Sequence, residues 1–99
     1  MTRAVLDAGA LIALERDDRQ MWAVLKLAAR RSGEVLVPSS VIAQVWRGSP
    51  RQAALARALQ HCVAVSFDTM VRPIGELCGR TRTTDICDAH VAIVAVTQG

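Results

Sequence analysis

Three short apolar segments alternate with longer segments of helical pattern, and this alternation constrains the fold more than any other feature. Residues 3–7 (RAVLD), 34–38 (EVLVP) and 63–67 (VAVSF) each have the length and apolar content of a buried strand. Helices between successive strands provide the crossovers that parallel strands require. Residues 1–99 therefore predict a single α/β domain with a short parallel sheet.

The segments around these strands carry helix signals. Ser49 and Pro50 occupy the cap and first positions of one expected helix, and Ser39 or Ser40 is expected to cap another that ends at Gly48. The expected helices cover residues 10–18, 19–33, 39–48, 49–62, 68–81 and 85–99.

Two of these helices are expected to be irregular. Pro73 and Gly75 are expected to kink or interrupt the helix at 68–81, and residues 94–97 (VAVT) are expected to turn extended. A strand would normally follow the last helix, but the sequence ends at Gly99. The sheet is therefore expected to lack its final strand.

Composition narrows the protein class. Hydrophobic residues make up 52% of the chain, and the three cysteines show no CxxC spacing, which is typical of free thiols in a reducing compartment. No signal peptide and no membrane-spanning run is recognisable, so a soluble, cytoplasmic protein is expected. The net charge of +3 permits a nucleic-acid partner without establishing one.

Three aspartates are the main candidates for a functional site. Asp7 follows the first strand, at the sheet edge where α/β proteins bind ligands; it could equally cap a helix beginning near Ala10. Asp85 and Asp88 stand three residues apart at the start of the last helix, where they suit both helix capping and a metal site. If all three meet at one edge, their oxygens suit Mg²⁺ or Mn²⁺.

The sequence resembles the PIN-domain toxins of VapBC toxin–antitoxin modules over essentially its whole length. The resemblance rests on three segments in the family's order: AVLDAGALIALERDD, VLVPSSVIAQVWRG-SPRQAALARAL and TTDICDAHVAIVA. It implies an α/β/α fold, Mg²⁺-dependent hydrolysis of RNA with Mn²⁺ as a substitute, a VapB-type antitoxin partner and a homodimer. It also implies that Asp7 and Asp88 are catalytic metal ligands and that Asp85 is a third ligand.

The chain departs from the family pattern at two places. Gln44 stands where the family has a second acidic residue, a Glu, and would be a neutral replacement for that ligand. The family's last strand, which ends in a TSD-like segment, has no counterpart here. Activity is therefore expected to be reduced or absent.

Three readings remain open: a Mg²⁺-dependent endoribonuclease, an inactive truncated PIN domain that docks an antitoxin or another protomer, and a relic that folds poorly alone. Arg80 and Arg82 precede the carboxylate pair and could hold an RNA backbone or form a solvated face. The remaining His and Trp residues fit structural roles best: His61, His90, Trp22 and Trp46.

Overall fold

The computed structural model describes residues 3–99. The sheet consists of β1 (Ala4–Val5), β2 (Val35–Pro38) and β3 (Val63–Val65). The α-helices are α1 (Ala8–Glu15), α2 (Arg19–Ser32), α3 (Ser39–Val45), α4 (Ala53–Leu59), α5 (Val71–Thr81) and α6 (Ile86–Gln98), and two short 3₁₀ helices are η1 (Pro50–Gln52) and η2 (Asp68–Met70).

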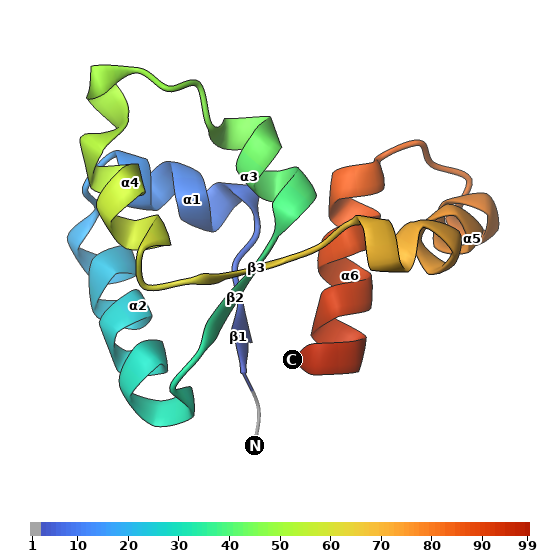
Figure 1. The fold of residues 1–99 in the computed structure, drawn as a ribbon, viewed down its shortest axis with the longest axis horizontal. Coiled ribbons are helices and arrows are strands. Elements are labelled where there is room, and N and C mark those ends of the chain that lie inside the picture. The colour runs from blue at the N-terminus through green and yellow to red at the C-terminus, as the bar shows by residue number, and fades with distance from the viewer. Residues whose placement is uncertain (1–2) are drawn as a thin grey trace.

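The three strands are parallel and lie in the order β1-β2-β3. Val5 pairs with Leu36, and Leu36 pairs with Val63 on the other side of β2. Helices connect the strands, as parallel pairing requires. The predicted α/β class with a short parallel sheet is confirmed (Figure 1).

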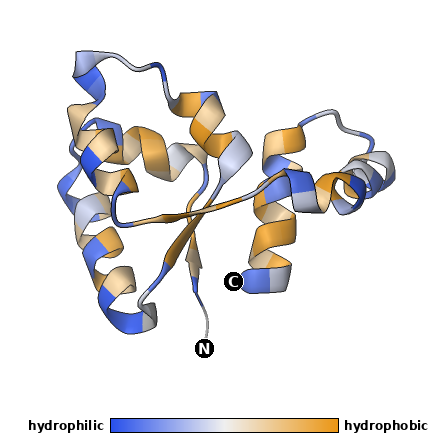
Figure 2. Cartoon of the chain, in the orientation of Figure 1, coloured by the Kyte–Doolittle hydropathy of each residue, from blue (hydrophilic) through white to orange (hydrophobic). Residues whose placement is uncertain are grey.

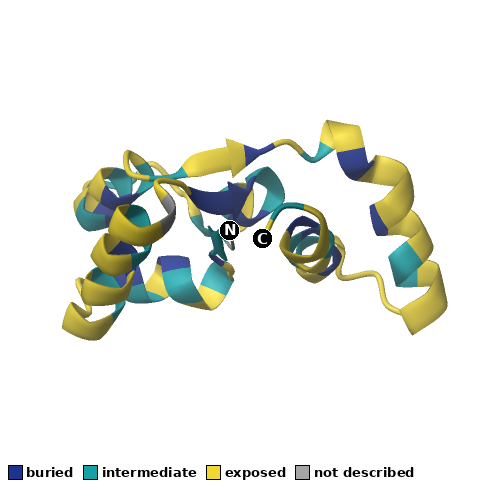
Figure 3. Cartoon of the chain, turned by 90° about the horizontal axis from the view of Figure 1, so that it is seen from below, coloured by how far each residue is buried: buried dark blue, intermediate teal, exposed yellow. Residues whose placement is uncertain are grey.

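The central strand is buried on both sides because helices cover both faces of the sheet. Val35 and Val37 belong to a core formed with α1, α2, α3 and α4, whereas Leu36 between them belongs to a second core with α5 and α6. Figure 2 shows apolar residues concentrated on the strands and on the helix surfaces that face them. Figure 3 shows that β3 is more exposed, and Val63 at this edge is 43% exposed.

The start and end of α3 differ from the prediction. Ser39 and Ser40 lie inside the helix, and Pro38 occupies the cap position without a side-chain hydrogen bond. The two hydroxyls have tertiary partners instead: Ser39 Oγ accepts from the backbone N–H of Phe67 at 3.0 Å, and Ser40 Oγ pairs with His90. The helix also ends at Val45 rather than at Gly48.

The two helices that the sequence predicts to be irregular are regular in the structure. Pro73 lies in the first turn of α5, where a missing N–H removes no intrahelical hydrogen bond, so the helix continues to Thr81. Residues 94–97 remain helical within α6, and Val94 is fully buried there. The expected interruption and the expected extended segment are both wrong. In residues 3–99, no helix combines the length and the apolarity needed to cross a membrane.

Candidate acidic site at the carboxyl edge of the sheet

Asp7 lies where β1 gives way to α1. Leu6 extends the strand pairing by donating its N–H to the carbonyl of Leu36 at 2.9 Å, and Asp7 follows in an extended conformation. Its Oδ1 accepts from the N–H of Ala10 at 2.9 Å, so Asp7 is the N-cap of α1. The predicted cap is confirmed, although the helix begins at Ala8. The carboxylate is nevertheless exposed to solvent.

Asp85 is the N-cap of α6, and Asp88 lies in its first turn. Asp85 Oδ1 accepts from the backbone N–H of Asp88 at 3.0 Å. Thr83 holds this geometry, because its Oγ1 accepts from the N–H of Asp85 at 3.1 Å. Both carboxylates are exposed. Asp85 therefore caps the helix, and its position leaves the pair accessible to a cation.

Asp88 is the carboxylate of the three whose pKa is affected by its neighbours. The pKa of Asp88 is raised above its ordinary value, first by a side-chain hydrogen bond with Asp85 and then by the negative charge of Asp85; desolvation and, last, the charge of Asp7 add smaller contributions. Among residues 3–99, however, no three His, Cys, Asp or Glu side chains are grouped closely enough to hold a metal ion as they stand.

Gln44 lies on α3, one turn beyond Ser40, and is exposed. Residues four apart share a helix face, and the Ser40 side chain faces α6, because its Oγ shares a hydrogen bond of 2.7 Å with Nδ1 of His90. Gln44 is therefore on the side of α3 toward the helix that carries Asp85 and Asp88.

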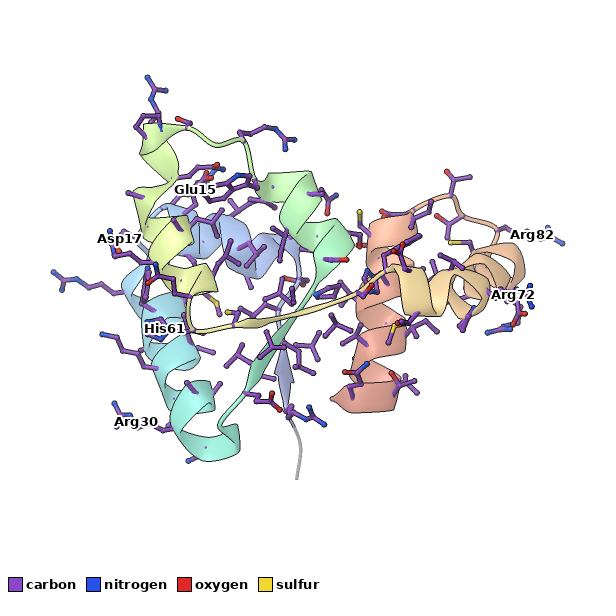
Figure 4. All side chains as sticks on the ribbon, viewed as in Figure 1. Glu15, Asp17, Arg30, His61, Arg72 and Arg82 are labelled. Carbon is purple, nitrogen blue, oxygen red and sulfur yellow. The ribbon has the colours of Figure 1, made fainter. Side chains whose placement is uncertain are left out.

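A groove between α5 and α6 borders the carboxylate pair, and the sequence alone did not reveal it. It has a volume of about 270 Å³, and its lining combines apolar and hydroxyl side chains with both carboxylates: Leu77, Thr81, Thr83, Asp85, Asp88, Ala89 and Ala92. The basic residues expected nearby are exposed. Arg82 is in a left-handed conformation at the end of α5 and points outward (Figure 4).

We predict that Asp85→Ala lowers the free energy of unfolding by about 1 kcal/mol, because the substitution removes the N-cap of α6. Asp85→Asn should unfold within a few tenths of a kcal/mol of the unmodified chain, since asparagine caps equally well. Denaturant unfolding of both variants measures this difference. Equal losses for the two variants would contradict the capping role.

His90 is a core residue of α6. Its side chain is fully buried, its ring packs edge-on against Phe67 at a centroid distance of 5.5 Å, and Nδ1 shares a hydrogen bond of 2.7 Å with Ser40 Oγ. Nε2 makes no hydrogen bond within the described part of the chain. Burial lowers the pKa of His90, and the backbone of Ser66 partly opposes this effect.

We predict that His90 makes the fold sensitive to acid. As pH falls through about 6.5, the usual pKa of histidine, the unfolded chain takes up a proton that the folded chain does not, so stability decreases by up to about 1.4 kcal/mol per pH unit. His90→Gln should flatten this dependence between pH 7 and pH 5. The exposed His61 provides the control. If His61→Gln reduced the pH dependence of the free energy of unfolding more than His90→Gln does, the assignment to His90 would be contradicted.

No family model matches this chain, and no curated protein or solved structure shows significant similarity to it.

Proposed function

We propose that the chain is a VapC-type toxin of the PIN-domain family, with an α/β/α PIN-like fold, and that it hydrolyses RNA phosphodiesters with Mg²⁺ or Mn²⁺ in the cytoplasm. The observation that carries the proposal is the placement of three exposed carboxylates: Asp7 follows β1 directly, and Asp85 and Asp88 lie at the start of α6. Crowded, exposed carboxylates at the carboxyl edge of a parallel sheet have the donor chemistry that a hard divalent cation requires.

In this proposal, Asp7 and Asp88 bind the cation and Asp85 supports them. A bound Mg²⁺ supplies Lewis acidity that activates water and offsets charge on the phosphodiester. Asp85 accepts a hydrogen bond from the backbone N–H of Asp88, and Thr83 Oγ1 accepts one from the backbone N–H of Asp85. The amide of Gln44 contributes an uncharged oxygen from the facing side of α3, so the site has less negative charge than a site with four carboxylates. Weaker cation binding follows from that smaller charge.

A second function is favoured by Gln44 and by an apolar groove between α3 and α4. The groove has a volume of about 360 Å³ and is lined by Ile42, Trp46, Ala56, Leu59 and Gln60. Trp46 is 40% exposed there, and a solvent-exposed indole is typical of protein interfaces. In this alternative, the chain does not cleave RNA but docks a VapB-type antitoxin or a second copy of itself.

A cleavage assay separates the two functions. The purified chain is incubated with a labelled structured RNA in the presence of Mg²⁺, of Mn²⁺ or of excess EDTA. The endoribonuclease yields discrete products only with Mg²⁺ or Mn²⁺. A folded chain that yields no products with either cation would overturn the enzymatic proposal and favour the docking function.

A further inference from the structure

Three cations form a straight row along α2. Arg19, Lys26 and Arg30 are separated by seven and four residues, which place their side chains within about 20° of one direction around the helix. At a rise of about 1.5 Å per residue, the row extends about 16 Å along the helix axis. All three side chains are exposed.

This row borders a groove between α2 and α4. The groove has a volume of about 710 Å³, and its lining adds the cation of Arg57 and the indole of Trp22 to the row. The Arg57 guanidinium lies 6.0 Å from the centre of the Trp22 ring, and the indole N–H donates to the carbonyl of Leu14 at 3.3 Å. The indole is therefore fixed within the groove by α1 while its ring faces a cation.

The groove is strongly positive. Four of its lining residues are cationic, and Asp17 is the one carboxylate among them. Within residues 3–99, none of the four cations forms an ion pair with a carboxylate. A smaller adjoining cavity shares Lys26 and Arg30 with the groove and is also lined by His61. Figure 4 shows Arg30, His61 and Asp17 along this side of the molecule, opposite the end that carries Arg72 and Arg82.

We propose that this row binds the phosphate backbone of single-stranded RNA, at a surface distinct from the carboxylates. A strand of RNA presents one anion per nucleotide along a line, which matches a straight row of unpaired cations. The Trp22 ring and the Arg57 guanidinium add planar groups of the kind on which bases stack. The inference rests on the proposed function, in which RNA is the substrate, because the row would then hold a long RNA whose other part reaches α6.

The test compares two triple variants in EDTA, where no cleavage occurs. One variant carries Arg19→Gln, Lys26→Gln and Arg30→Gln. The control carries Arg16→Gln, Arg51→Gln and Arg72→Gln, which removes the same charge from exposed positions outside the groove. Fluorescence anisotropy measures the binding of a labelled oligouridylate at several salt concentrations, and thermal melts check that both variants fold.

The row variant should bind the oligouridylate about 100-fold more weakly than the unmodified chain at 0.1 M salt, with the slope of log K against log salt reduced by about 2. The control should retain binding within about threefold. Equal weakening in both variants would overturn the proposal, since net charge alone would then explain binding. Equally tight binding of an oligoglutamate, lost in the same variant, would also overturn it and identify an acidic polypeptide as the ligand. Neither result depends on catalysis, so failure of the proposed ribonuclease activity would be recognised separately.

Discussion

Asp7→Asn is expected to reduce Mg²⁺-dependent RNA cleavage at least about 100-fold without weakening the fold. The carboxylate is one of two proposed direct cation ligands, and an amide in its place lowers both cation affinity and the stabilisation of developing charge. Asparagine retains an oxygen that can accept from the N–H of Ala10, so the N-cap of α1 is kept.

Gel analysis of RNA products over time measures this effect, and a thermal melt of the same sample shows whether the fold is retained. Glu76→Gln is the matched control, because Glu76 is an exposed carboxylate on α5 that lines neither the groove beside the acidic pair nor the basic groove. Cleavage by Asp7→Asn at the rate of the control would contradict the proposed ligand role.

Gln52→Ala is expected to lower the free energy of unfolding by about 2–3 kcal/mol and the melting temperature by about 10–20 °C. The Gln52 side chain is buried, at 5% exposure. Its Oε1 accepts from the backbone N–H groups of Arg47 at 2.7 Å and Gly48 at 3.1 Å. Its Nε2 donates to the carbonyl of Val45 at 2.9 Å and to the Glu15 carboxylate. Removal of the amide leaves backbone groups after α3 without partners.

Gln60→Ala provides the control for this prediction, because Gln60 is an exposed glutamine at the end of α4. Its free energy of unfolding should stay within about 0.5 kcal/mol of that of the unmodified chain. Denaturant unfolding of the three proteins measures both effects. Coincident unfolding curves would contradict the structural role of Gln52, and a broad, non-cooperative transition of the unmodified chain would support the reading of a poorly folding relic.

The sequence predicted correctly the features that depend on interactions between residues close together in the chain. The apolar run VLVP became the central strand, and Asp7 and Asp85 became N-caps because their carboxylates reach backbone N–H groups three residues away. Ser39 and Ser40 misled the prediction of α3, because their hydroxyls are used by Phe67 and His90, which lie 28 and 50 residues away in the chain. Such tertiary competition cannot be read from a cap pattern.

The acidic site was predictable only in part. Parallel topology implied that Asp7 and the start of α6 lie at the same edge, and the influence of Asp7 on the pKa of Asp88 agrees with that expectation. The α5–α6 groove could not be predicted, because it depends on how α5 packs. The spacing of Arg19, Lys26 and Arg30 is visible in the sequence, whereas Arg57 joins them only through the tertiary fold, which places its guanidinium over the Trp22 ring.

Calorimetric titration of the purified chain with Mn²⁺ tests the central claim most directly, because it measures cation binding without an RNA substrate. The unmodified chain and Glu76→Gln should both bind Mn²⁺, whereas Asp7→Asn and Asp88→Asn should each lose detectable binding. A folded, unmodified chain that gives no binding heat, or an Asp88→Asn variant that binds as the unmodified chain does, would contradict a metal site at these carboxylates. Asp7 and Asp85 would then be helix caps alone.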